Sequence, residues 1–555
     1  MNPFLWIILL AVGSSFTFNA NTLATQQKPQ PNKPNKIAPL FKGLSDYQFP
    51  VSTNSKLAQR YFNQGMMLSY GFNHAEAARS FRGAQKADPK CAMAYWGEAL
   101  VLGPNINLAM QDDNVPKAWK ALQKAVKLAH KATSREQDYI AALQKRYVAN
   151  PVKDRSKLDM AYVNAMRKLA AKYPNDYDAH VLFAESMMDT TPWNYWDNGP
   201  KPKPITKEIL RTLERVLARR PNHAGACHLY IHAVEAAHPE WAEAAADRLR
   251  TLVPGAGHLV HMPSHIYIRI GRYADASKAN VKAVASDNAY VTQCHAQGVY
   301  PLAYMPHNHH FLWFAASMEG RAEQSIAAAK HIAKHTDPKR MRMPGFGTLQ
   351  HFHSMGMYAL ARFGKWKAIK AYPKPKPDLK YPTGVWHYVR GLAHCREDDL
   401  KTAKKHLASL KQLAADKTLD KVTIWDNNNT RQILQIAEQV LAGEIAAQQE
   451  NWKAAIRHHK KAVQFEDAMR YEEPQLWYAP TRQFLGAVLL QAKQPAQAEV
   501  TFRADLKKYP KNGWSLFGLH KALVAQGKTN EARLVQRARD KAWRRADVKL
   551  TSPRF

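Results

Sequence analysis

Histidine is concentrated in one stretch of the sequence, residues 223–310, and imidazole is a preferred protein ligand for several transition metals. An even spread of the chain's 24 histidines over its 555 residues would place only about four in a stretch of this length. The stretch instead holds eleven, namely His223, His228, His232, His238, His258, His261, His265, His295, His307, His309 and His310. Metal binding is therefore the first chemistry to consider.

Six of these histidines fall into three pairs with the spacing of one helical face, where side chains three or four residues apart are neighbours. The pairs are His228 with His232, His261 with His265, and His307 with His310. The first two pairs are 33 residues apart, which is close to a common helical-repeat length, so they should stack across adjacent repeats. We predict that all six are metal ligands.

Three or four imidazoles with a carboxylate complete a first shell for copper, iron or zinc, and the spacing does not choose among these metals. Glu235 is the nearest carboxylate, three residues past His232. It could be a ligand, an orienting partner or a general base. If the site is catalytic, an open coordination position would activate water or dioxygen, with Glu235 moving protons. Whether the protein is an enzyme stays open.

The remaining histidines of the stretch are expected in loops or on the surface: His223, His238, His258, His295 and His309. Two metal-free readings are also open for the cluster, a metal-free hydrolase and a scaffold whose histidines line a groove that binds an acidic peptide. The sequence contains no HExxH, GxSxG, P-loop, dinucleotide-binding or CxxC motif.

The elements that must position these histidines follow a helical-repeat grammar. Gly65, Ala77, Phe81, Ala84 and Pro89 lie at offsets of 0, 12, 16, 19 and 24, the small, small, aromatic, small and proline positions of a tetratricopeptide helix pair. The same pattern returns at Gly486, Ala498, Phe502 and Pro510, with degenerate copies between. We predict an all-α fold, a right-handed tetratricopeptide-repeat α-solenoid.

Two prolines interrupt this pattern beside the histidine pairs. Pro263 lies between His261 and His265, and Pro306 directly precedes His307. Proline is tolerated in the first turn of a helix and not in its interior, so helices should begin at these points. His265 and His310 would then lie in first helical turns.

The chain divides by composition into six parts. These are an amino-terminal signal peptide (1–24), a flexible Pro- and Lys-rich leader (25–45), amino-terminal repeats (46–190), a Pro- and Trp-rich loop that could gate the site (191–206), central His-rich repeats (207–365) and carboxy-terminal repeats (366–555). The apolar core of residues 4–12 is too short to span a bilayer, so we expect a periplasmic or secreted protein with no transmembrane anchor after cleavage.

Three segments carry a family resemblance: YGFNHAEAARSFRGAQKADPKCAMAYWGEALVLGPNIN, HLVHMPSHIYIRIGRYADA and APTRQFLGAVLLQAKQPAQAEVTFRADL. They resemble a family of exported bacterial tetratricopeptide-repeat proteins with a His-rich central segment. The resemblance covers most of the mature chain and implies fold and export. It implies no activity.

The net charge limits the kinds of partner that are expected, and the cysteine content limits the possible disulfides. The 80 Lys and Arg against 45 Asp and Glu give a net charge of +35, which favours an acidic protein, an acidic peptide or another polyanion as partner. The basic residues form no run and no nucleic-acid-binding motif, so no specific nucleic-acid partner is expected. Of the four cysteines, Cys227 and Cys294 are the candidate disulfide pair in an exported protein.

Overall fold

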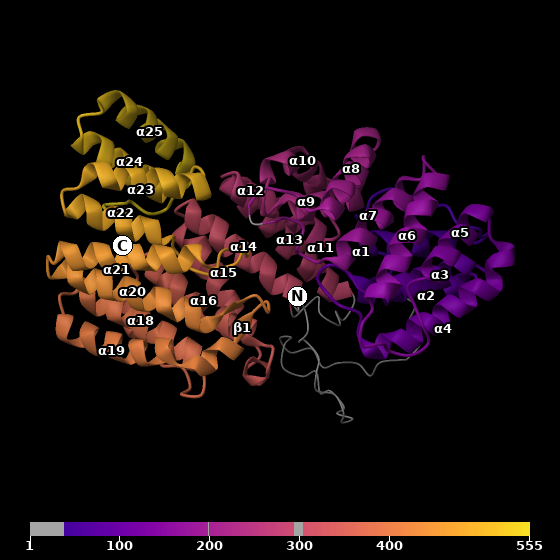
Figure 1. Cartoon of the computed structure of the whole chain (residues 1–555), viewed down its shortest axis with the longest axis horizontal. Helices are drawn as coiled ribbons and strands as arrows, with labels where there is room; N and C mark the ends of the chain where they lie inside the picture. Colours follow the sequence, from indigo (N-terminus) through magenta and orange to yellow (C-terminus); the bar gives the residue numbers. More distant parts are fainter. Residues whose placement is uncertain (1–37, 198, 294–302) are drawn as a thin grey trace. The chain divides into compact units, whose positions relative to one another are not determined.

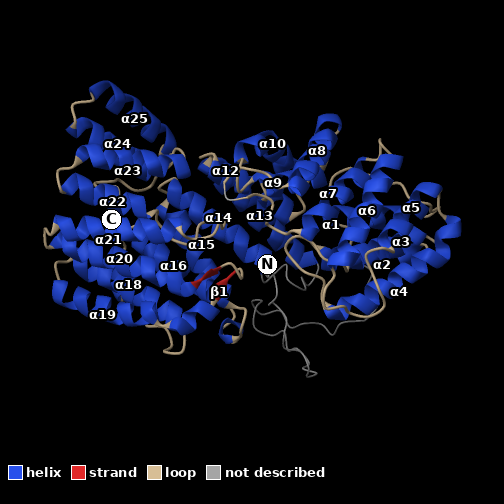
Figure 2. Ribbon diagram, in the orientation of Figure 1, coloured by secondary structure: helices blue, strands red, loops and turns tan. Residues whose placement is uncertain are grey.

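The structure of the protein is a computed structural model that describes residues 38–197, 199–293 and 303–555. Helices dominate the described residues, and the only named strands there form one two-residue antiparallel pair, β1 (Thr423–Ile424) with β2 (Asn428–Asn429) (Figures 1 and 2). The predicted all-α solenoid is confirmed. The predicted signal peptide and most of the leader lie outside the described residues.

Two compact units make up the described chain. Of the described residues, the amino-terminal unit comprises 38–197, 199–267, 278–293 and 303–308, and the carboxy-terminal unit comprises 268–277 and 309–555. The division falls inside the segment 207–365, which the sequence analysis predicts to be one block of central repeats. Helices α12 (Pro263–Arg269), α13 (Tyr273–Gln293) and α14 (Met305–Met318) each contribute residues to both units.

In the amino-terminal unit, consecutive helices pack against one another, as Figure 1 shows for its indigo to magenta part. The helices are α1 (Lys56–Tyr70), α2 (His74–Ala87), α3 (Ala92–Val101), α4 (Val115–Leu128), α5 (Ser134–Leu143), α6 (Ser156–Lys172), α7 (Tyr177–Thr190), α8 (Pro204–Arg219), α9 (Ala224–Val234), α10 (Glu243–Leu252) and α11 (Gly257–His261). Short 3-10 helices are η1 (Asp112–Asn114), η2 (Ala129–Lys131) and η3 (Pro239–Ala242).

The carboxy-terminal unit continues in the same way. Its helices are α15 (Ala322–Lys334), α16 (Gly347–Arg362), α17 (Trp366–Lys370), α18 (Lys380–Arg396), α19 (Leu400–Ala415), α20 (Thr430–Gln448), α21 (Trp452–Asp467), α22 (Thr481–Gln491), α23 (Pro495–Lys508), α24 (Gly513–Ala525) and α25 (Thr529–Ala542). Short 3-10 helices are η5 (Arg340–Arg342) and η6 (Lys417–Lys421).

Glycines and aromatic rings explain how neighbouring helices approach closely. Phe81 of α2 is buried between Gly65 of α1 and Gly97 of α3, and a Cβ added at either glycine would meet its ring at 2.7 or 2.3 Å. Phe502 of α23 is enclosed in the same way by Gly486 and Gly518. The repeat grammar therefore works through close packing of a ring between two bare helix backbones.

Helix starts agree with the local sequence. Thr133 forms a capping box with Glu136 at the start of α5, and Ser55 caps α1 through the backbone N–H of Ala58. Pro204 and Pro495 occupy the first positions of α8 and α23, where a proline costs no hydrogen bond. Within the described residues, no helix is both long and apolar enough to cross a bilayer.

Candidate metal centre

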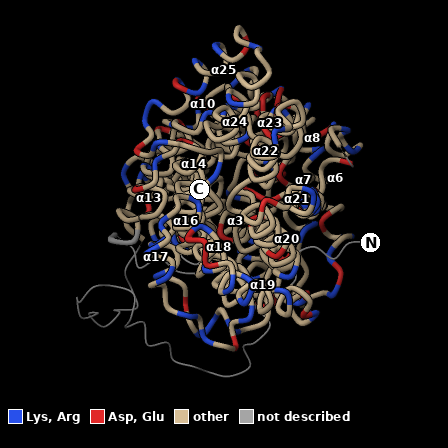
Figure 3. Tube along the Cα trace, turned by 90° about the vertical axis from the view of Figure 1, so that its left-hand side faces the viewer, with Lys and Arg blue, Asp and Glu red and all other residues tan. Residues whose placement is uncertain are grey.

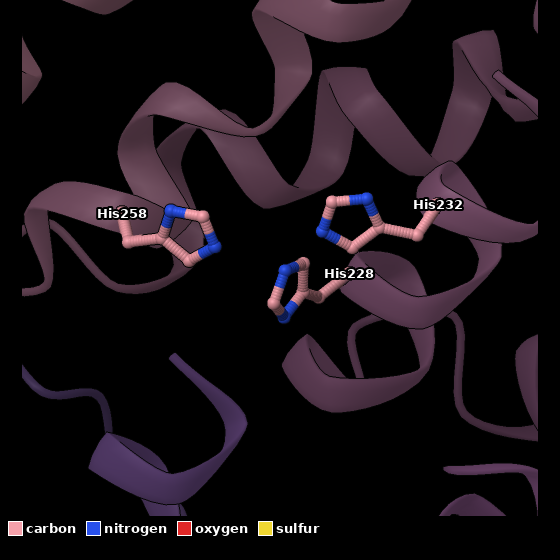
Figure 4. A group of neighbouring side chains, drawn as sticks. All are labelled: His228, His232 and His258. Carbon is pink, nitrogen blue, oxygen red and sulfur yellow. The ribbon is translucent and has the colours of Figure 1, made fainter. Parts of the chain in front are cut away.

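Three histidines of the amino-terminal unit converge on one buried space, which we call the first triad. His228 and His232 come from α9, and His258 comes from α11 (Figure 4). One ring nitrogen from each lies within 4.8 Å of the others, and all three side chains are buried. Such a group has the size of a three-ligand metal shell.

A second triad, also in the amino-terminal unit, consists of His261, His265 and His307. His261 ends α11, His265 lies in the first turn of α12 and His307 lies in the first turn of α14. The helices begin at Pro263 and at Met305, just before Pro306, as the two prolines predict, but His310 is the sixth residue of α14 and does not lie in its first turn. One ring nitrogen from each histidine again lies within 4.8 Å of the others.

The triads adjoin. The ring centroids of His232 and His265 are 5.7 Å apart, and those of His258 and His261 are 6.0 Å apart. Glu235 joins the two groups, because one carboxylate oxygen lies 3.4 Å from Nδ1 of His232 and the other 3.0 Å from Nδ1 of His265. The carboxylate therefore orients one imidazole in each triad.

Oxygen acceptors hold Nδ1 of two further histidines. Nδ1 of His228 lies 2.6 Å from the backbone carbonyl of Tyr70, at the end of α1. Nδ1 of His261 lies 2.7 Å from the side-chain oxygen of Asn280, whose amide nitrogen donates to Ser264 at 2.8 Å. An acceptor at Nδ1 requires the ring proton there, so Nε2 carries the lone pair.

The Nε2 atoms of these rings fit a lone pair at that position. Nε2 of His228 and Nε2 of His232 are buried and have no hydrogen-bond partner among the described residues. Nε2 of His261 and Nε2 of His265 lie 3.0 Å apart, although both Nδ1 atoms face oxygen acceptors. Two imidazole nitrogens this close either share a proton in a hydrogen bond or face a cation that lies between or beside them.

Burial favours the neutral imidazoles that metal binding needs. It holds the pKa of His228, His258 and His261 well below the usual value of 6.5, with neighbouring histidines adding to the effect, and it also lowers the pKa of His232. Burial alone would raise the pKa of Glu235, but His265 and His232 lower it to about 2, so this carboxylate stays charged.

Aromatic side chains wall the first triad. The Phe72 ring lies 4.5 Å from that of His228, and the Tyr304 ring lies 4.6 Å from that of His258, between centroids. Trp193, in the loop predicted as a gate, stands edge-on to His232 at 5.0 Å and is 38% exposed. The wall limits water near the histidines and leaves Trp193 at its outer edge.

Five of the six predicted ligands thus lie in the triads, and the structure does not bring His310 to either of them. His310 belongs to the carboxy-terminal unit, where its ring stacks on Trp313 at 5.5 Å and lies 5.9 Å from that of His351. His258, expected in a loop or on the surface, instead completes the first triad. Its three-residue spacing from His261 was the available signal.

The other histidines of the stretch have separate surroundings. His223 caps α9 and contacts Asp178, His238 stacks on Trp241, and His309 stacks on His331. His295 and Cys294 lie outside the described residues. The predicted pairing of Cys294 with the buried Cys227 therefore stays a prediction.

Comparison with known proteins adds no assignment to this site. No protein-family model matches the sequence, and no curated protein matches it significantly. Solved structures that it resembles include the human IFIT1 dimer with m7Gppp-AAAA (13% identity, 89% of this chain and 91% of that chain, TM-score 0.29). Others are the APC/C hetero-tetramer Cut9–Hcn1 (12%, 89% and 78%, 0.29) and the P58(IPK) TPR domain (13%, 85% and 99%, 0.22).

Proposed function

We propose that this chain is a helical-repeat scaffold whose amino-terminal unit binds transition metal through the two histidine triads. One observation carries the proposal. Four of the six imidazoles have Nδ1 held by an oxygen acceptor, which leaves their Nε2 lone pairs inside a buried site. Metal-binding histidines are oriented in this way in general, by an acceptor on the ring nitrogen opposite the metal.

Distances agree with this assignment. Two imidazole nitrogens on one tetrahedral ion are about 3.3 Å apart when each metal–nitrogen bond is about 2.0–2.1 Å. The 3.0 Å between Nε2 of His261 and Nε2 of His265 is close to that separation. Copper, iron and zinc all accept imidazole, so all three remain candidates.

The role of Glu235 follows from its contacts. With one oxygen toward His232 and the other toward His265, it serves as an orienting carboxylate in the proposed site. The alternative of a general base stays a prediction. Three protein ligands in each triad would leave a coordination position for water or a small substrate, which is the arrangement of catalytic metal sites. The proposal includes export, for which the apolar segment of residues 4–12 is the support.

Elemental analysis tests the proposal. Protein expressed without an affinity tag and purified without chelator should contain copper, iron or zinc. Combined replacement of His232 and His265 by Ala should remove the metal, whereas His130→Ala, an exposed histidine of the same unit, should not. Metal-free protein with an unchanged melting temperature on addition of chelator or metal would exclude the function.

A basic depression in the carboxy-terminal unit favours a second candidate function, binding of an acidic peptide. Its lining comes from α20 and α21 and includes Lys453, Arg457, Lys460 and Lys461. Figure 3 shows Lys and Arg spread over many helices, with Asp and Glu between them. A peptide with several carboxylates would meet these four cations.

Peptide binding can be tested separately from metal binding. A Glu-rich peptide should bind the protein with an affinity that falls with salt, and a Lys-rich peptide should not. Replacing Lys453, Arg457 and Lys460 together by Glu should abolish binding. The matched control replaces the exposed Lys117, Lys120 and Lys124 of α4 by Glu. Equal binding by both variants would exclude the depression as the binding surface.

A further inference from the structure

The six histidines fall into two separate groups of three, which bears on the number of metal ions. With metal–nitrogen bonds of about 2.0–2.1 Å, two ligands of one ion lie at most about 4.2 Å apart. In each triad, one ring nitrogen from each member lies within 4.8 Å of the others, which is only slightly above this limit. The two triads share no member, and each supplies three imidazoles. Two ions, one in each triad, fit this division.

Each triad has its own supports. The first is held by the carbonyl of Tyr70 at His228, and the second by the amide of Asn280 at His261. The two triads also share one support, the buried carboxylate of Glu235. A carboxylate that orients a ligand of each ion makes the position of each ligand dependent on the same group.

The donor set favours copper. Both triads consist of imidazoles, and the one acidic side chain joined to both, Glu235, faces Nδ1 and leaves Nε2 to the metal. Among divalent first-row ions, copper binds nitrogen sites most tightly. Three imidazoles are also a sufficient set for copper without a thiolate.

We propose that the triads form a dinuclear centre, in which each binds one copper ion and Glu235 links the two. The inference rests on the proposed metal-binding function and adds its nuclearity, its metal and the coupling group. Neighbouring rings of the two triads are 5.7 and 6.0 Å apart between centroids, so two bound Cu(II) ions would be close neighbours whose unpaired electrons interact.

Copper titration with electron paramagnetic resonance tests the pair without any substitution. Metal-free full-length protein is titrated with Cu(II) at neutral pH, and bound copper is measured by elemental analysis. The expected result is two copper ions per chain and, at full loading, a half-field resonance, which arises only from a coupled pair of Cu(II) ions. The ordinary signal of isolated Cu(II) should then account for much less than the copper present.

Variants assign each ion to its triad. His258→Asn should remove the first-triad ion, and His307→Asn the second-triad ion; each should bind one copper and lose the half-field resonance. His130→Asn is the control and should bind two. Glu235→Gln keeps the shape of the side chain and should weaken copper affinity about 10- to 100-fold, since the loss of an orienting partner has that size.

The outcomes separate the two proposals. One copper per chain, or two that give the full signal of isolated Cu(II), overturns the dinuclear centre and leaves metal binding intact. No bound copper, iron or zinc at all overturns both. Since the wild-type measurement needs no variant, a variant that fails to fold does not leave the inference undecided.

Discussion

The side-chain oxygen of Asn280 lies 2.7 Å from Nδ1 of His261, and Ser264 accepts a hydrogen bond from the amide nitrogen of the same asparagine. Together the two contacts determine that the oxygen of the amide, and not its nitrogen, points toward the imidazole. It also places the lone pair of His261 on Nε2, toward His265. Asn280 is thus a positioning residue of the second triad.

Replacing Asn280 by Leu should therefore weaken metal binding at the second triad. Loss of such an orienting partner lowers metal affinity about 10- to 100-fold. The measurement is a competition titration with a chromophoric chelator, which resolves the weaker from the tighter site. Asn164→Leu, an exposed asparagine of the same unit, is the control. Equal affinities in Asn280→Leu and Asn164→Leu would contradict the positioning role.

The buried histidines should make the metal-free protein less stable in acid. The pKa of His228, His232, His258 and His261 is lowered in the folded chain, so the unfolded chain binds more protons below its pKa of 6.5. The contribution of these histidines to the free energy of unfolding is fully present above pH 6.5 and is lost as the pH falls below it. Between pH 7.5 and 5.0 each histidine contributes a loss of up to about 2 kcal/mol.

Urea unfolding of metal-free protein at several pH values in this range measures the loss. Glu235 does not contribute to it, because its pKa of about 2 leaves it charged throughout. A free energy of unfolding that stays constant from pH 7.5 to 5.0 would show that the histidines are not buried in neutral form.

Sequence periodicity could predict much of the ligand set, because four of the histidines form two pairs with the four-residue spacing of one helical face. His228 and His232 lie on one face of α9, and the 33-residue spacing brings His265 beside His232. The spacing of His258 from His261 is also helical, but it does not show that the two histidines belong to different triads. Helix α11 is only five residues long and ends at His261, before Pro263. His258 and His261 nevertheless belong to different triads.

The residues that orient the histidines of the triads could not all be predicted from the sequence, for another reason. Tyr70 precedes His228 by 158 residues and acts through its backbone carbonyl, which any residue type could supply. Asn280 is 19 residues from His261 and has no motif. Glu235 was identified from its spacing to His232, but its contact with His265 depends on how α9 and α12 pack.

A buried charge cluster should govern the stability of the carboxy-terminal unit. Glu444 of α20 is fully buried and contacts Arg396, the Nε of Arg554 at 2.8 Å and the Nε2 of His459 at 3.0 Å. Although burial favours its neutral form, Arg396 and Arg554 hold the pKa of Glu444 well below its usual value. The carboxylate is therefore the counter-charge of two arginines.

Glu444→Gln should destabilise this unit by about 3–5 kcal/mol, because it leaves buried cations uncompensated. Hydrogen exchange at the amides of α20 measures the change. The control is Glu531→Gln, which removes an exposed partner of Arg503 and should cost less than about 1 kcal/mol. Similar protection of α20 in both variants would show that the cluster contributes little.

The glycines of the repeat should differ in what an added methyl group does. A Cβ at Gly518 would lie 2.2 Å from the Phe502 ring, so Gly518→Ala should cost about 1–3 kcal/mol through overpacking. At Gly356 the nearest atom is the hydroxyl of Tyr372 at 3.2 Å, the movable end of a side chain. There the gain in helix propensity, about 0.5–1 kcal/mol, should prevail.

Thermal unfolding of the two alanine variants provides the comparison. Gly518→Ala should melt below the wild type, and Gly356→Ala at or above it. The reverse order would mean that the ring of Phe502 can move aside while the hydroxyl of Tyr372 cannot.

Trp193 should slow the exchange of metal with solvent. It is 38% exposed, its backbone has a φ of 60°, and its ring stands edge-on to His232 at 5.0 Å. An aromatic contact of this kind contributes about 0.5–1.5 kcal/mol. If that contact must break before the metal leaves, Trp193→Ala should release metal to a chelator about two- to tenfold faster.

Trp241 is the matched control, since it is 45% exposed and stacks on His238 in the same unit. Stopped-flow measurement of metal transfer should give the wild-type rate for Trp241→Ala. Equal rates for both variants would show that metal leaves the first triad by a path that Trp193 does not cover.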